Sequence, residues 1–464
     1  MPFQRRLNLF DATMLVVGNV VGAGIFTTAG FLAGELPDPW LFTGIWIIGG
    51  LLTLCGALTY AEMTSMFPRS GGDYLYLKAA YGPWAGFLLA WIGFWIINPG
   101  SIAVLAMGLT KYLAGSGDIF GGMDEKWTAV AIVALFPLVN FRGVRLAGTS
   151  QNFWTLGSLA LILFLVIGGV ASGKGNWEHF SRDATGAFSL SKLLGPAMIA
   201  VIFSYSGWFV TAYIGDEVKR PERNLPLSLT FGTLIVIVLY VAVNVVYLYA
   251  VPVQNLPGVI NVGQVVGARL MPHGLAQAVT LAIILAIAAS INATVLAGAR
   301  LSYAVAKDGF FWSALEKIHG RYGTPHIALL IQAALACFYI VFDTFDGLLS
   351  AVVFIMLLSS IGVGLAHFIL RRRMPFAERP YRTWCYPFVP LLFIVTYSYI
   401  AVQILLTNPL RSALGVAITI SGLPFFIYAL RRKDRQAAVA PIDSSSSQMV
   451  RLLKKRSGGV VSKS

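Results

Sequence analysis

Long apolar runs separated by short polar connections are the feature that most limits how this chain can fold. The first run covers about residues 10–34, and runs of similar length recur to about residue 430. A helix crosses the hydrocarbon core of a bilayer with roughly 20 apolar residues, whereas the strands of a membrane barrel alternate in polarity over about ten. The runs therefore predict an all-α polytopic membrane protein.

The number of runs sets the number of expected helices. The chain has 464 residues, of which 12% are charged, against about 25% in soluble domains. Twelve transmembrane helices are predicted, at about residues 10–34, 40–66, 83–112, 126–141, 149–171, 193–218, 226–250, 277–306, 325–342, 347–370, 387–407 and 410–430. Residues 1–9 are expected to be a short N-terminal segment.

The distribution of Lys and Arg predicts the orientation. With the N-terminus inside, the inner connections and the C-terminal tail hold 26 of the 34 basic residues, and the outer connections hold seven. Cytoplasmic loops of membrane proteins carry the excess of basic residues. Both termini are therefore expected in the cytoplasm, and the net charge of +14 needs no nucleic-acid partner. Residues 431–464 are expected to be a basic disordered tail, with attraction to anionic lipid as an open alternative.

The stretch from Val20 to Phe26 lies at the middle of the first run and contains Gly22 and Gly24. Two interpretations fit it. Glycines at alternate positions allow a chain to stop being helical in mid-membrane and leave N–H and C=O groups free for a ligand. Alternatively, Gly18 and Gly22 form a small-xxx-small pair that lets two helices approach closely.

A second candidate break lies between Phe203 and Trp208, where an otherwise apolar run becomes small, polar and glycine-bearing. Transporters built from inverted repeats have interrupted helices at corresponding positions of the two halves. If residues 10–171 and 193–370 are two repeats of five helices, both breaks lie in the first helix of a repeat. This correspondence favours binding over packing. Residues 387–430 would then add two further helices.

Two such breaks would suit a zwitterion. Where a helix unwinds, the continuing half presents unpaired N–H groups with a positive dipole, and the ending half presents unpaired carbonyls. The first suits a carboxylate and the second an ammonium, so the pair predicts a receptor for the backbone of an α-amino acid. The expected donors are the N–H groups of Ala23, Gly24 and Ile25, the expected acceptors are the carbonyls of Val20, Val21, Phe203, Ser204 and Ser206, and Gly22 and Gly207 permit the breaks.

The side chain of the substrate is expected to be neutral. No Asp, Glu, Lys or Arg lies deep in the predicted helices around the breaks, and a site for a charged side chain would be expected to show its counter-charge. Asn98, before Pro99, is a candidate pocket residue, with interhelical hydrogen bonding as its other explanation. Phe203 is the candidate gate, although core packing accounts for most aromatic residues at helical spacing.

An ion site, an enzyme and a channel are the remaining alternatives. Ser158, Ser290 and Thr294 could supply oxygens to a sodium ion, or be structural hydroxyls. No cofactor and no other metal site is predicted: the five histidines lie in loops or near helix ends, and neither H-E-x-x-H nor G-x-S-x-G occurs. This disfavours an intramembrane enzyme. A repeated filter-like segment, which a channel would need, is also missing.

Several motifs resemble the amino acid–polyamine–organocation (APC) superfamily. Its GSGIF-type break is similar to Gly22-Ala23-Gly24-Ile25-Phe26. Further similar segments are Ala61–Tyr74, Phe203–Trp208, Glu217–Lys219 and Arg223–Pro226, while Ser290–Asn292, Glu378–Pro380 and Ser421–Pro424 most resemble the L-type amino acid transporter (LAT) branch. The resemblance extends to about residue 430.

The resemblance implies a five-plus-five inverted repeat with broken first and sixth helices, and exchange or uptake of amino acids by alternating access. An exchanger of neutral L-amino acids in the plasma membrane is the leading hypothesis, and a proton- or sodium-coupled symporter of the same fold is the alternative. By similarity, Ala23 and Gly24 would bind the carboxylate, and the carbonyls of Val20, Phe203 and Ser206 would bind the amino group. Phe203 would be the gate.

Two departures from the family pattern bear on mechanism and partners. Ser158 stands where many relatives carry a lysine beside the first helix, which puts the coupling role of that lysine in question. Residues 115–126 contain no cysteine, so the disulfide to a heavy chain found in animal L-type transporters is not expected. A stand-alone transporter of a prokaryotic inner membrane is predicted, with its oligomeric state left open.

Overall fold

A computed structural model describes residues 5, 7–22, 24–69, 71–115, 124–141, 147–181, 195–319 and 324–439, with the side chains of 139, 141, 147–155 and 433–439 left out. Within these ranges the regular structure is helical, apart from one isolated bridge between Leu7 and Val218. The predicted all-α architecture is confirmed.

Each of the twelve predicted runs contains helix where the structure describes it. In chain order the helices are α1 (Leu9–Val20), α2 (Gly24–Thr27), α3 (Ala29–Glu35), α4 (Pro39–Met66), α5 (Asp73–Tyr81), α6 (Pro83–Ile92), η1 (Gly93–Ile97), α7 (Asn98–Ala114), α8 (Glu125–Phe141), α9 (Ala147–Ala171), η3 (Trp177–Phe180), α11 (Pro196–Tyr205), η4 (Trp208–Glu217), α12 (Pro221–Ala250), η5 (Val253–Asn255), α13 (Val262–Leu270), α14 (His273–Lys307), η6 (Ser313–Glu316), α15 (His326–Phe342), α16 (Phe345–Arg373), α17 (Phe388–Thr407) and α18 (Pro409–Val439). The short helices α5 and α13 lie in connections between the predicted spans.

Length and composition identify most of these helices as membrane spans. In the described part of the chain, nine helical runs are long and apolar enough to cross a bilayer, and Leu156–Ala171 and His326–Phe342 are shorter apolar helices. The polytopic membrane architecture is thus confirmed, whereas the count of twelve spans and the division into two repeats remain predictions.

Capping side chains determine where the first helices begin. Asn8 and Asp11 form a reciprocal capping box at α1, with Asp11 N–H donating to Asn8 Oδ1 at 3.0 Å and Asn8 N–H to Asp11 Oδ2 at 2.9 Å. Asp38 Oδ1 accepts from Trp40 N–H at 2.9 Å at the start of α4. These bonds satisfy N–H groups that have no partner within a helix.

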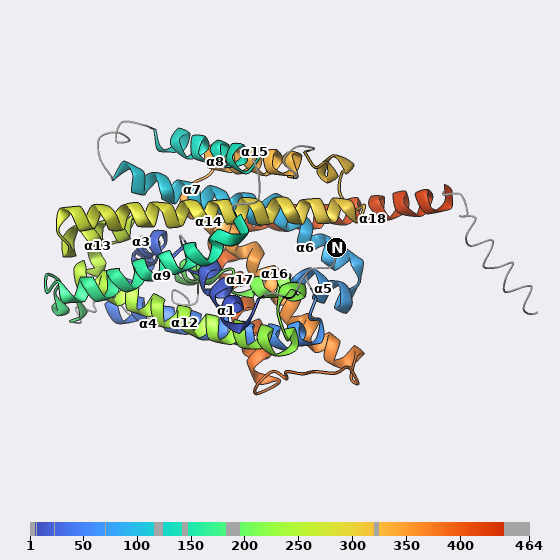
Figure 1. The fold of residues 1–464 in the computed structure, drawn as a ribbon, viewed down its shortest axis with the longest axis horizontal. Helices are drawn as coiled ribbons and strands as arrows, with labels where there is room; N and C mark the ends of the chain where they lie inside the picture. Colours follow the sequence, from blue (N-terminus) through green and yellow to red (C-terminus); the bar gives the residue numbers. More distant parts are fainter. Residues whose placement is uncertain are drawn as a thin grey trace, which may run out of the picture.

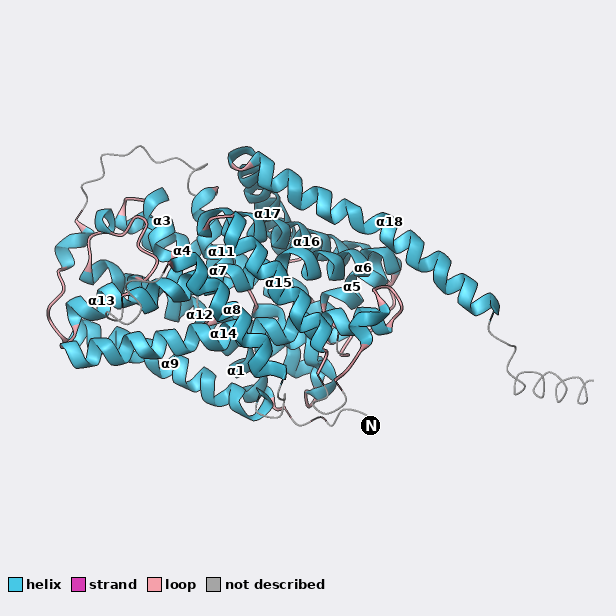
Figure 2. Ribbon diagram, turned by 90° about the horizontal axis from the view of Figure 1, so that it is seen from above, coloured by secondary structure: helices cyan, strands magenta, loops and turns pink. Residues whose placement is uncertain are grey.

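The long helices run along one direction of the molecule (Figures 1 and 2). Helix α12 packs against both α4 and α1, and α14 packs against α7 and α15. Helix α5 and the end of α18 lie at the same end of the bundle (Figure 1). This arrangement leaves α1 and α11 inside the bundle, where α11 contacts α2, α3 and α4.

Two predicted segments need correction. The run at 83–112 is not one continuous α-helix, because the five residues of η1 form a π-helical turn between α6 and α7. Pro99, which has no N–H to donate, follows this turn. The predicted tail at 431–464 begins too early, since α18 continues to Val439; residues 440–464 lie outside the described residues.

Candidate functional site

The first predicted break is present in the structure. Helix α1 ends when Val21 adopts φ −70° and ψ 74°, an inverse γ-turn in which Gly22 N–H donates to the carbonyl of Val20 at 2.7 Å. Helical structure resumes at Gly24. The main chain therefore leaves the α-helix between Val20 and Gly24, as the glycine pattern predicts; Ala23 lies outside the described residues.

The second predicted break is present as well. Helix α11 ends at Tyr205, Ser206 is extended, and Gly207 has φ +94°. That left-handed conformation is accessible to glycine without steric cost. The Ser206 N–H donates to the carbonyl of Phe203 at 3.1 Å, and a 3₁₀ helix, η4, continues from Trp208. Phe203, the candidate gate, is buried beside this break.

The two breaks lie against each other. A Cβ added to Gly24 would be 2.7 Å from the Cα of Ser204. The hydroxyls of Thr28 and Ser204 are hydrogen-bonded at 2.8 Å, and Asn19 Nδ2 donates to the carbonyl of Gly207 at 2.8 Å. Segments almost 200 residues apart in sequence are thereby joined at the points where both helices are interrupted.

Tyr240 of α12 connects the carbonyls at the two breaks. Its hydroxyl lies 2.7 Å from the carbonyl oxygen of Val20 and 2.9 Å from that of Ser204. The ring is buried, 5.0 Å from the ring of Tyr205 and 5.7 Å from that of Trp46 between centroids. Sequence reasoning missed this residue; the available signal was a hydroxyl in the middle of the apolar run at 226–250.

The candidate coupling residues lie near the first break. A Cβ on Gly22 would be 2.8 Å from Ser290 Oγ, so this hydroxyl faces the break. Ser290 donates to the carbonyl of Ala286 at 3.0 Å, and Thr294 donates to the carbonyl of Ser290 at 2.9 Å. Ser158 is half-buried on α9, which packs against α1 and α14. All three hydroxyls are thus on helices that surround the first break.

Asn98 has a different neighbourhood. Its amide nitrogen lies 3.7 Å from the position of a Cβ on Gly93, beside Leu301 of α14. The carbonyl of Trp95, to which the missing N–H of Pro99 would have donated, accepts a hydrogen bond from the hydroxyl of Tyr339 at 2.6 Å. Among the contacts of the described residues, none joins Asn98 to Gly24 or Ser204.

Buried charge is concentrated away from the breaks. Among the described residues, the buried acidic and basic side chains other than His367 are Glu62 and Asp73, near the end of α4 and the start of α5. Glu62 accepts hydrogen bonds from Arg371 Nε at 2.8 Å and Arg379 Nε at 3.1 Å. This network holds the segment after α16 against α4.

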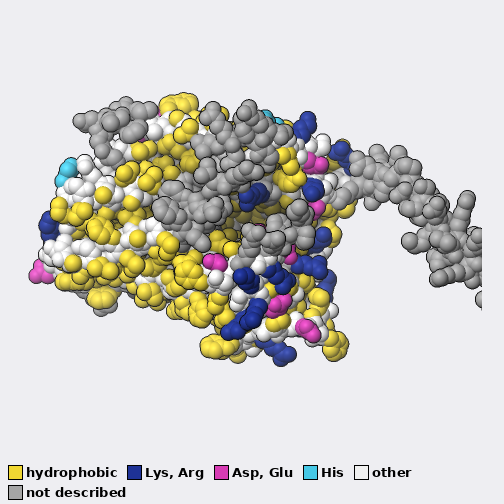
Figure 3. All heavy atoms as spheres, viewed as in Figure 1, with side chains coloured by type: hydrophobic (Ala, Val, Ile, Leu, Met, Phe, Trp, Pro, Cys, Tyr) yellow, Lys and Arg dark blue, Asp and Glu magenta, His cyan; other side chains and the backbone are white. Residues whose placement is uncertain are grey.

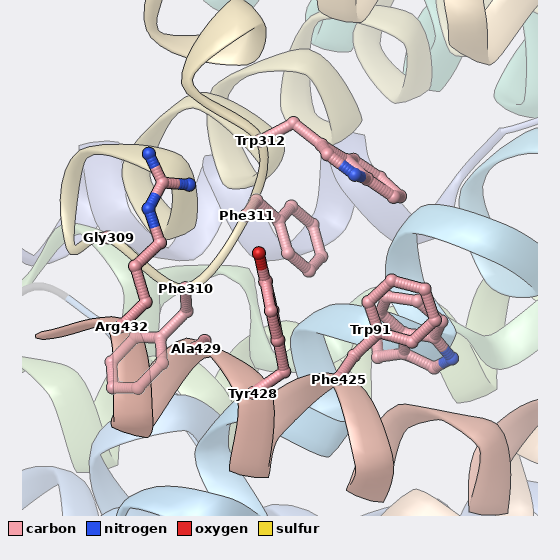
Figure 4. Close-up of a pocket in the computed structure, with 9 residues that line it drawn as sticks. All are labelled: Trp91, Gly309, Phe310, Phe311, Trp312, Phe425, Tyr428, Ala429 and Arg432. Carbon is pink, nitrogen blue, oxygen red and sulfur yellow. The ribbon is translucent and has the colours of Figure 1, made fainter.

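A separate cavity of about 60 Å³ lies at the surface between α6, the segment after α14 and α18. Aromatic rings and one guanidinium line it (Figure 4): Trp91, Gly309, Phe310, Phe311, Trp312, Phe425, Tyr428, Ala429 and Arg432. Its lining includes none of the residues at the two breaks. Aromatic residues of this kind are enriched where spans meet the membrane surface.

The part of the chain that matches known proteins includes both breaks. A family model described as amino acid permease matches residues 7–428. The serine/threonine exchanger SteT of Bacillus subtilis (strain 168) is 29% identical, over 93% of this chain and 98% of its own length. The Asc-type amino acid transporter 1 of Mus musculus is 30% identical, over 94% of this chain and 83% of its own length. The cystine/glutamate transporter of Homo sapiens is 29% identical, over 91% of this chain and 85% of its own length.

Proposed function

This chain belongs to the amino acid permease family, and from that premise we propose that it exchanges neutral L-amino acids across the plasma membrane by alternating access. Family membership makes it an amino acid transporter rather than an enzyme. The observation that carries the proposal is the close approach of two helix breaks whose carbonyls, at Val20 and Ser204, share the hydroxyl of Tyr240.

The substrate backbone would bind across the two breaks. Its ammonium would take the carbonyls of Val20 and Ser204, with those of Phe203 and Ser206 as further acceptors. Its carboxylate would take the N–H groups that open the continuing half of the first helix, at Ala23, Gly24 and Ile25, where the helix dipole favours negative charge. The main support is that Gly24 lies in van der Waals contact range of Ser204, so one ligand can reach both helix breaks.

We infer a neutral substrate side chain from the residues around the two breaks rather than from the family match. The relatives include a cystine/glutamate transporter as well as a serine/threonine exchanger, so the family match alone leaves side-chain charge open. The buried acids of the described chain are Glu62, which is paired with Arg371, and Asp73, which is hydrogen-bonded to Tyr60 and Tyr213. A cationic or anionic side chain would therefore meet no opposite charge in the site.

Exchange is preferred to symport because one relative is named as an exchanger, and a proton- or sodium-coupled symporter remains the alternative. Counterflow in proteoliposomes distinguishes them. Labelled serine should accumulate only when the vesicles contain unlabelled amino acid, and without any ion gradient. Uptake into empty vesicles that depends on an imposed sodium or proton gradient would contradict exchange and support the symporter.

The proposed orientation has both termini in the cytoplasm. Lys and Arg side chains gather at the end of the molecule that carries α5, while hydrophobic side chains cover the flank (Figure 3). The excess of basic residues marks the cytoplasmic side of membrane proteins. We also infer that the transporter works without a disulfide-linked heavy chain, because the connection at 115–126 has no cysteine.

A further inference from the structure

The connection between α4 and α5 is seated against the second half of the broken helix, η4. The N–H of Gly72 donates to the carbonyl of Ala212 at 3.1 Å. Gly215 of η4 also lies close to this connection. A Cβ added to Gly215 would lie 3.0 Å from the carbonyl carbons of Pro68 and Arg69. Pro68, Arg69 and Gly72 are therefore docked directly on the half-helix that follows the second break.

A buried carboxyl adjoins this contact. Asp73, the first residue of α5, is only 5% exposed, and its Oδ1 has no hydrogen-bond partner among the described residues. The titratable groups that face it are the hydroxyls of Tyr60 from α4, Tyr76 from α5 and Tyr213 from η4. None of these is a cation, so the carboxyl has no counter-charge among the described residues.

A carboxylate in such surroundings is costly when ionised. Burial raises the pKa of Asp73 to about 7, and hydrogen bonding from Tyr60 and Tyr213 offsets only part of this effect. In water the pKa of an aspartate is about 3.9. If η4 moved away from the connection, Asp73 would be hydrated and its pKa would fall towards that value.

The sign of the linkage follows from these two pKa values. Protonation favours the docked conformation, because the pKa is higher there. The stabilisation of docking is complete below about pH 4, decreases as the pH rises, and is lost above about pH 7. One linked proton changes the docking equilibrium by at most about tenfold per pH unit.

We propose that Asp73 is a proton-binding site whose occupation keeps η4 docked and the cytoplasmic side of the transporter closed. The inference rests on the proposed function, since it takes movement of η4 to be part of alternating access. The proton enters and leaves from the cytoplasmic side, so it regulates exchange without being transported. Acidification of the cytoplasm should then slow exchange.

Alkylation of a cysteine at the docked contact tests this directly. Ala212 is buried against the connection, so an A212C thiol, in a background with the three native cysteines replaced by alanine, should react with N-ethylmaleimide only when η4 undocks. The full chain in lipid nanodiscs is labelled between pH 6 and pH 8 without substrate. The same pH series on D73N measures how much ionisation of the thiol alone changes the labelling rate.

The labelling rate relative to D73N should rise about tenfold from pH 6 to pH 8 and level off above pH 7. D308N, which removes an exposed carboxylate at the same end of the molecule, should leave this rise intact. A ratio that stays constant with pH, or a D308N variant that abolishes the rise, would overturn the proposal.

Y213F gives an independent measurement if D73N fails to fold. It removes a donor that favours the ionised carboxyl, so the midpoint of the labelling curve should move to higher pH, whereas an unmoved midpoint contradicts the proposal. Because labelling needs no substrate, a pH-dependent rate in a protein that fails the counterflow assay would refute the exchanger and leave the proton site standing.

Discussion

Replacing Gly24 by alanine tests whether the close approach of the two breaks is required for transport. The new Cβ would lie 2.7 Å from the Cα of Ser204 and 3.0 Å from its Oγ. Ordinary van der Waals contact begins near 3.4 Å, so α2 and α11 must separate by about 0.7 Å. Both atoms belong to the second break, and the Cα cannot rotate away.

Overpacking of this kind costs about 1–3 kcal/mol, which corresponds to a loss of roughly 5- to 150-fold in an equilibrium constant. We expect this loss in kcat/KM for exchange in proteoliposomes, with a normal elution profile in size-exclusion chromatography. The matched control is Gly34→Ala, in the same apolar run, because no heavy atom lies within 4 Å of its Cβ. Wild-type kinetics in G24A, or an equal defect in both variants, would refute the reasoning.

The remaining predictions concern the second break, the coupling residues and the charged network. Y240F should raise KM about fivefold, because about 1 kcal/mol of hydrogen bonding is lost; an unchanged KM would remove this hydroxyl from the site. F203A should weaken substrate binding or closure, and unaltered exchange kinetics would exclude Phe203 as the gate. S290A should leave exchange and its insensitivity to sodium intact, whereas sodium-dependent transport lost in this variant would establish an ion site. E62A should lower the free energy of unfolding by about 3–5 kcal/mol, because Arg371 loses its buried partner; an unshifted thermal midpoint would contradict this.

Local signals in the sequence were sufficient for the architecture, whereas the breaks were predicted only when the two glycine-bearing stretches were compared. Apolar runs of about 20 residues specify spans whatever their neighbours are, and Gly22, Gly24 and Gly207 permit the backbone to leave the helix. The structure confirms both interruptions. The roles of the individual site residues stay predictions until transport is measured.

Contacts between distant segments could not be predicted in this way. Hydrogen bonds of Asn19, Thr28 and Tyr240 join the two breaks. No local sequence pattern predicts which helices contact each other. The reasoning on Pro99 shows the same limit. Pro99 has no N–H to donate to a nearby carbonyl, but the carbonyl of Trp95 is bonded to Tyr339 of α15, which sequence alone does not bring alongside.

The Tyr240 hydroxyl has one proton to share between two carbonyl oxygens, 2.7 and 2.9 Å away. It can donate its hydrogen atom to only one of them at a time, and the Val20 carbonyl also accepts the N–H of Gly22 at 2.7 Å. An ammonium brings three hydrogen atoms. On the proposed function, a substrate ammonium would add donors to both carbonyls and would join the two breaks more firmly than the single hydroxyl of Tyr240 does.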